Sequence, residues 1–84
     1  MKLTDYQLDT ITTMAINAYD CAQEMGKSDA ALVRHSTLRE AISIFLNMLA
    51  GKCLSTSDGM EVVFSNGKDK PPTRESVEKF ILGL

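Results

Sequence analysis

The stretch AISIFLNMLAGKC, residues 41–53, decides the fold. Its first ten residues include only two polar side chains, Ser43 and Asn47. A membrane-spanning helix needs about 18 or more apolar residues in a row, and Arg39 and Lys52 flank this shorter run. The stretch therefore predicts a helix in a protein core or interface, and no membrane segment.

This central helix carries more apolar surface than one packing contact can cover. On a helical wheel its apolar residues span an arc of about 200°, whereas a helix packed on one side needs a stripe of about 100°. These residues are Leu38, Ala41, Ile42, Ile44, Phe45, Leu46, Met48 and Leu49. We expect Ile44, Leu46 and Met48 to form a self-interface in a homodimer. The competing interpretation is a monomer in which the rest of the chain completes the cover.

The segment before the central helix predicts another long helix. In TDYQ, residues 4–7, Thr4 and Gln7 have the spacing of a capping box, which predicts a helix over about residues 5–25. Gly26 follows, where a left-handed C-cap is expected. Apolar residues then recur at helical spacing: Leu8, Ile11, Ala15, Ala18, Tyr19, Ala22 and Met25.

Residues 28–50 can be interpreted in two ways. Ser28 is a good N-cap and predicts a short helix over 29–35. Thr37 and Glu40 then form a second capping box that would open a separate helix. The alternative is one continuous helix over 29–50.

The C-terminal third predicts a small β-hairpin followed by a helix. Met60–Phe64 is β-prone, and Asp58-Gly59 is a good turn joining it to Cys53–Thr56. Asn66-Gly67 is the alternative turn. Beyond two prolines, Thr73 is expected to cap a last helix. The fold class is thus mainly α with a minor β part: one domain over residues 1–84, a three-helix bundle with a hairpin before the C-terminal helix.

No pattern in the chain predicts catalysis, a cofactor or a metal site. The GKS sequence at 26–28 lacks the glycine of a phosphate-binding loop, since Cys21 stands there. His35, Cys21 and Cys53 lack the paired spacing of zinc ligands. We therefore expect a protein that is not an enzyme. Cysteines without a disulfide framework and a start without a secretory signal indicate a cytoplasmic location.

Residues 20–35 resemble a helix-turn-helix. Ala22, Gly26 and Leu32 match that motif's pattern of alanine, glycine and apolar residue. The resemblance implies, as an alternative function, a DNA-binding regulator that uses residues 20–39. In that case the basic side chains of Arg34, His35 and Arg39 would contact DNA. The net charge of −2 is spread evenly along the chain, which makes nucleic acid the less expected partner.

The main prediction is a small non-enzymatic protein-binding module of the regulator, adaptor or inhibitor type. Its partner is expected to be a protein, first of all a second copy of itself. The polar side of the first helix is a further candidate surface for a basic heterologous protein, because opposite charge steers association. That surface comprises Asp5, Asp9, Ile16, Asp20 and Glu24.

Overall fold

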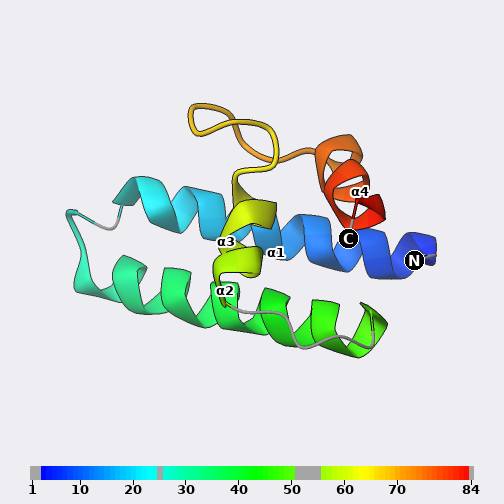
Figure 1. The fold of residues 1–84 in the computed structure, drawn as a ribbon. Helices are drawn as coiled ribbons and strands as arrows, with labels where there is room; N and C mark the ends of the chain where they lie inside the picture. The colour runs from blue at the N-terminus through cyan, green and yellow to red at the C-terminus, as the bar shows by residue number, and fades with distance from the viewer. Residues whose placement is uncertain (1–2, 25, 51–55, 84) are drawn as a thin grey trace.

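The described residues form four helices, one more than the three predicted, connected by short segments. The computed structural model describes residues 3–24, 26–50 and 56–83. The helices are α1 (Asp5–Glu24), α2 (Asp29–Ala50), α3 (Thr56–Val63) and α4 (Arg74–Leu82). Figure 1 shows α1 and α2 running antiparallel beside each other. Helix α3 packs against both of them, and α4 packs against α1 and α3. Among the described residues, no helix is long and apolar enough to cross a membrane.

The capping box predicted at the start of α1 is confirmed. The Thr4 backbone N–H donates to Gln7 Oε1 at 2.9 Å, and the Gln7 N–H donates to Thr4 Oγ1 at 3.1 Å. The left-handed cap predicted at Gly26 is wrong, because Gly26 does not have a positive φ. The chain leaves α1 through a turn in which the Lys27 N–H donates to the Glu24 carbonyl at 2.9 Å.

α2 is one unbroken helix, as the second interpretation predicted. Ser28 caps it, since its Oγ accepts from the Ala31 N–H at 3.3 Å. The capping box predicted at Thr37 is wrong: the Thr37 hydroxyl donates to the Val33 carbonyl four residues back, at 2.9 Å. This bond satisfies a hydroxyl inside a helix, so threonine does not end the helix here.

The β-hairpin predicted before the last helix is wrong, and no strand occurs among residues 3–24, 26–50 and 56–83. The expected strand Met60–Phe64 and the expected turn Asp58-Gly59 fall largely within α3. Gly59, Val62 and Val63 are all buried, and they follow the i, i+3, i+4 spacing of one helix face. Most of the other expected strand, Cys53–Thr56, lies outside the described residues.

The turn at Asn66-Gly67 connects α3 to the loop before α4. Gly67 has a φ of 98°, a conformation that favours glycine, and its N–H donates to the Phe64 carbonyl at 3.0 Å. The Asn66 side chain then donates to the Pro71 carbonyl at 3.1 Å. The alternative turn at Asn66-Gly67 therefore does form a turn, although it joins no strands.

The cap predicted for the last helix is confirmed. Thr73 and Ser76 form a capping box, in which the Ser76 N–H donates to Thr73 Oγ1 at 3.1 Å and the Thr73 N–H donates to Ser76 Oγ at 2.9 Å. The Ser76 hydroxyl also lies 2.8 Å from that of Ser65. This contact ties the loop to the first turn of α4.

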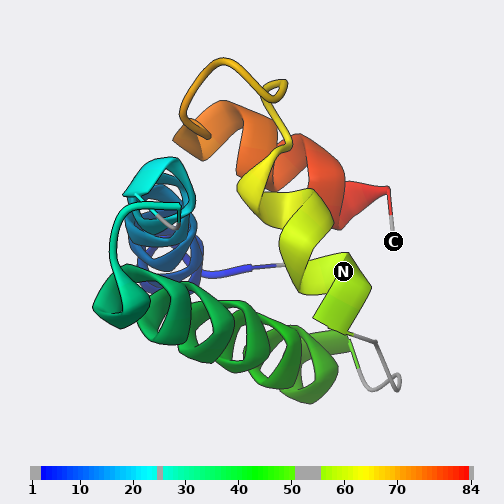
Figure 2. The same cartoon turned by 90° about the vertical axis from the view of Figure 1, so that its left-hand side faces the viewer.

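All four helices contribute to one hydrophobic core. Its large fully buried side chains are Leu8, Ile11, Ile42, Leu46, Val62, Val63, Val77 and Ile81. The ring of Tyr19 meets Phe64 edge to face, with centroids 6.1 Å apart. Figure 2 shows that α1, α3 and α4 all lie on one side of α2. The side of α2 that faces away from them is therefore left without a helix against it.

Helix α3 lies in close contact with α2 at Gly59. A Cβ atom at this position would lie 2.5 Å from the carbonyl oxygen of Arg39 and 2.6 Å from Ser43 Oγ. Both distances are shorter than van der Waals contact, so only glycine fits. Gly59, which the sequence predicted as a turn residue, is instead the position at which α3 contacts α2.

Candidate interaction surface

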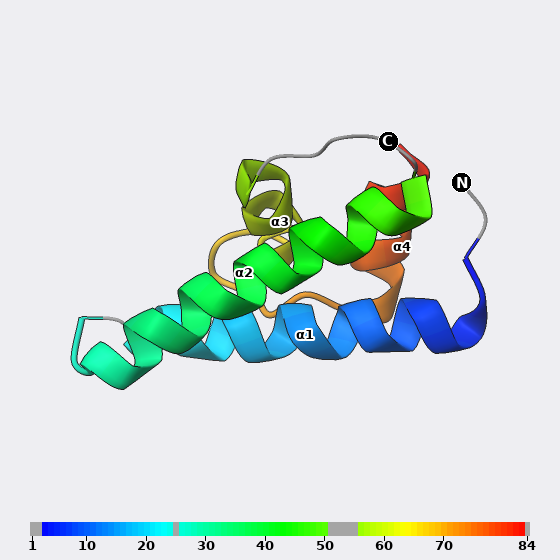
Figure 3. The same ribbon diagram turned by 90° about the horizontal axis from the view of Figure 1, so that it is seen from below.

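The outer side of α2 carries a row of exposed apolar side chains. Val33 is 65% exposed, Ile44 59% and Met48 78%. Thr37 is also exposed and Ala41 is half-buried. Each of these five residues lies three or four positions after the one before it, so all five share one helix face. We call this row, Val33, Thr37, Ala41, Ile44 and Met48, the outer stripe. Figure 3 shows the helix that carries it crossing in front of α1.

Leu46 does not belong to this surface, although the sequence interpretation placed it with Ile44 and Met48. Its side chain is fully buried, with 0% exposure, in the core shared with Ile42. Two residues along an α-helix correspond to a rotation of about 200°. Ile44 and Met48 can therefore share a face while Leu46 points to the opposite side.

Charged residues border the outer stripe on both edges. Arg34 is exposed on one edge, and Glu40 is exposed on the other. Near the start of the helix, a shallow depression is lined by Asp29, Ala30, Val33, Arg34 and Thr37. The stripe thus has an apolar centre and a charged rim, the arrangement found in many protein interfaces.

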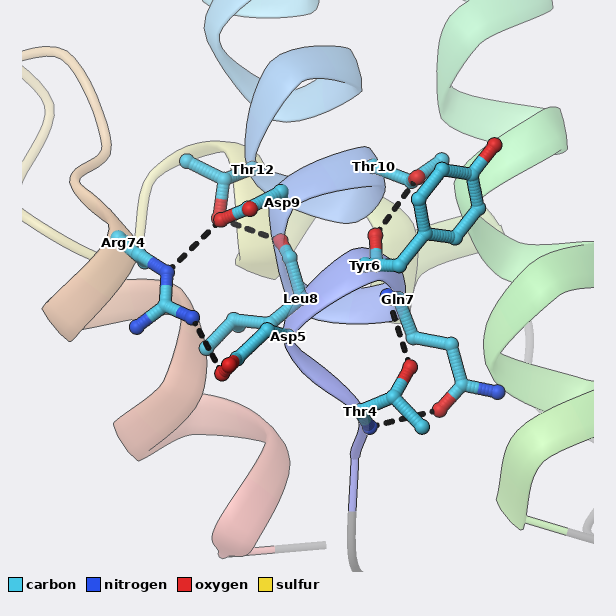
Figure 4. Close-up of polar contacts among 9 residues, drawn as sticks. All are labelled: Thr4, Asp5, Tyr6, Gln7, Leu8, Asp9, Thr10, Thr12 and Arg74. Atoms are coloured by element: carbon cyan, nitrogen blue, oxygen red, sulfur yellow. Dashed lines mark hydrogen bonds and ion pairs between the residues drawn. The ribbon is translucent and has the colours of Figure 1, made fainter.

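Two of the acidic candidate residues on α1 form ion pairs with Arg74 of α4. Arg74 at the start of α4 donates from Nε to Asp9 Oδ1 at 2.8 Å and from an Nη to Asp5 Oδ1 at 2.9 Å (Figure 4). Asp20 and Glu24 are exposed further along α1, and Ile16 is 37% exposed. Two of the four carboxylates are thus already engaged within the chain.

Hydrogen bonds with Asp9 and Asp5 raise the pKa of Arg74. The three side chains are nevertheless well exposed, so water and salt screen their attraction. We expect Arg74→Ala to lower the melting temperature only slightly. The decrease should be smaller than that caused by Gly59→Ala or Leu46→Ala, which change the buried interior. The loss should shrink between about 0.01 M and 1 M salt, over which the screening length falls from about 30 Å to 3 Å. Thermal unfolding followed by circular dichroism measures it. Lys79→Ala, at the other end of α4, is the control, and a loss independent of salt would contradict the assignment.

The basic residues of the DNA-binding alternative do not form one surface. Arg34 is exposed, but His35 is only 2% exposed and its Nδ1 lies 3.0 Å from the Ala18 carbonyl. Because a carbonyl oxygen only accepts hydrogen bonds, Nδ1 is the donor in this contact. Arg39 is partly buried, and its Nε has no hydrogen-bond partner among the described residues. His35 shares the inner face of α2 with Ile42, seven residues on, a spacing that could have identified it as a core residue.

The described residues provide no convergence of potential metal ligands. Among residues 3–24, 26–50 and 56–83, no group of three His, Cys, Asp or Glu side chains comes together. Cys21 is a buried free thiol, and Cys53 lies outside the described residues.

Comparison with protein-family models, with curated proteins and with solved structures gives no match to this chain. The function proposed below accordingly rests on the residues of the chain itself.

Proposed function

We propose that this protein is a small non-enzymatic protein-binding module that self-associates through the outer stripe of α2. The observation that carries this proposal is the exposure of three large apolar side chains, Val33, Ile44 and Met48, along one face of a 22-residue helix. Isolated exposed apolar residues are ordinary on protein surfaces, whereas an aligned set with a charged rim is typical of binding sites.

The energetics favour covering this face. Full burial of a valine, isoleucine or methionine side chain contributes about 1.5–3 kcal/mol, and association costs about 4–15 kcal/mol in lost freedom. Two copies contribute the stripe twice, which brings the gain into the range of the cost. A domain of this length has an unfolding free energy of only about 4–13 kcal/mol. Association through the stripe therefore adds stability where the single chain has little.

The alternatives have less support from the geometry. DNA binding through residues 20–39 would rely on His35, which is buried, and on Arg39, which is partly buried. Its helices would also need the near-perpendicular arrangement of a helix-turn-helix, whereas α1 and α2 run antiparallel beside each other (Figure 1). A basic protein partner would find Asp20 and Glu24 exposed, whereas at Asp5 and Asp9 it would compete with Arg74.

Charged residues introduced into the stripe test the proposal. We expect the double variant Ile44→Asp, Met48→Asp to self-associate at least about tenfold more weakly than the unmodified chain, because two carboxylates would have to be desolvated in each copy. Sedimentation equilibrium measures the dissociation constant. Leu82→Asp is the matched control, since Leu82 is 62% exposed on α4, away from the stripe.

Circular dichroism establishes that each variant keeps its helices. If the double variant associates as tightly as the unmodified chain, the stripe is not the interface. If Leu82→Asp weakens association just as much, the interface lies elsewhere or the effect is one of net charge.

A further inference from the structure

We propose that the second copy docks on the outer stripe in parallel, with the two-fold axis running along the direction of α2. This inference rests on the proposed self-association and adds its geometry. It is based on the charges along the outer stripe, because the two edges of the stripe carry charges of opposite sign.

The helix geometry places these charges symmetrically about the stripe. At about 100° per residue, Arg34 and Glu40 lie three residues before and after Thr37, hence about 60° to either side of it. Asp29 lies about 80° from Thr37, on the same side as Glu40. All three side chains are exposed. One edge of the stripe is therefore positive and the other is negative.

A two-fold axis parallel to the helix exchanges the two edges. The positive edge of one copy then faces the negative edge of the other, and Arg34 sits between the levels of Asp29 and Glu40 of the second copy. The offsets along the helix are five and six residues, or about 7.5 Å and 9 Å. The long arginine side chain spans such offsets, as pairs across parallel helical interfaces do.

An antiparallel arrangement gives the opposite electrostatics. A two-fold axis perpendicular to α2 places each edge against the same edge of the second copy. When it is centred on the stripe between Val33 and Met48, the two Glu40 carboxylates meet at nearly the same level, and Arg34 faces no acidic residue of the rim. Like charges opposed across an interface disfavour that arrangement. The parallel arrangement also brings Val33, Ile44 and Met48 against their own counterparts.

Charge reversal tests this geometry. We expect Arg34→Glu and Glu40→Arg, each alone, to weaken self-association about threefold to tenfold at low salt, since each change occurs twice in a dimer. The double variant Arg34→Glu, Glu40→Arg should recover most of the loss, because the opposite signs are restored. Glu78→Arg, an exposed position on α4, is the control for the change in net charge.

Cross-linking gives the orientation directly. Under mild oxidation, Met48→Cys should form a disulfide-linked dimer, since parallel docking places the two positions side by side. Antiparallel docking centred on the stripe would separate them by about 20 Å along the helix, beyond the reach of a disulfide. The unmodified chain, which contains Cys21 and Cys53, is the control.

Each outcome is decisive. The parallel geometry is wrong if Arg34→Glu does not weaken the dimer. It is also wrong if a disulfide forms only when Val33→Cys and Met48→Cys chains are mixed. Either result would leave the self-association itself intact. An unmodified chain that stays monomeric would overturn both.

Discussion

Replacing Gly59 by alanine is expected to destabilise the fold by about 2–4 kcal/mol, as overpacking against a rigid neighbour does. The added Cβ would lie 2.5 Å from the Arg39 carbonyl oxygen, in the middle of α2, and 2.6 Å from Ser43 Oγ. A backbone carbonyl inside a helix cannot turn aside, so α3 must move away from α2. Alanine favours the helical state by about 1 kcal/mol over glycine, which offsets only part of this loss.

Urea unfolding followed by circular dichroism measures the change. Gly26→Ala is the matched control, because no atom lies within 4 Å of its added Cβ and Gly26 does not have a positive φ. We expect this control to be neutral or slightly more stable. A Gly59→Ala protein as stable as Gly26→Ala would show that α3 does not contact α2 at this point.

The second large effect is expected at Leu46. Leu46→Ala should lower the free energy of unfolding by about 2–5 kcal/mol, because it removes a fully buried side chain and leaves a cavity. The unfolding free energy of a domain of this length is about 4–13 kcal/mol, so the loss is a large part of the total. Met48→Ala, two residues on at 78% exposure, should change the intrinsic stability by less than about 0.5 kcal/mol.

These two variants separate the core from the interface. Met48→Ala should weaken self-association, whereas Leu46→Ala should act on folding. Unfolding measured at several protein concentrations distinguishes a loss of folding stability from a loss of self-association. Only association adds a contribution to the apparent stability that depends on protein concentration. Equal losses of intrinsic stability for both variants would contradict the burial of Leu46 and the exposure of Met48.

The helix boundaries that the sequence predicted best are those set by local bonds. Thr4 with Gln7, and Thr73 with its first helical turn, have partners three residues away, so spacing alone identifies them. The same reasoning failed at Thr37, because a threonine hydroxyl can also bond inside a helix. Local sequence does not distinguish these two uses of the side chain.

The conformation of α3 could not be derived from its residues. Met60–Phe64 combines β-branched and aromatic residues in a short run, and periodicity does not separate a strand from a buried helix in so few residues. The helix buries Val62 and Val63 together against the other three helices and brings Gly59 against α2. These contacts join residues distant in the chain, and the sequence alone does not show them.

The three residues predicted for the self-interface differ in their exposure. Ile44 and Met48 are exposed as expected, and Leu46 is not, since the width of the apolar arc could not show which part of it faces the core. The bonds of Arg74 to Asp9 and Asp5 join residues 65 and 69 positions apart. No local pattern predicts them.

The molar mass of the unmodified chain in solution tests the proposed self-association most directly. Light scattering over a hundredfold range of concentration separates a chain of 9.2 kDa from a dimer of twice that mass. We predict a rise to the dimer mass with increasing concentration. A mass that stays at 9.2 kDa throughout would contradict self-association through the outer stripe.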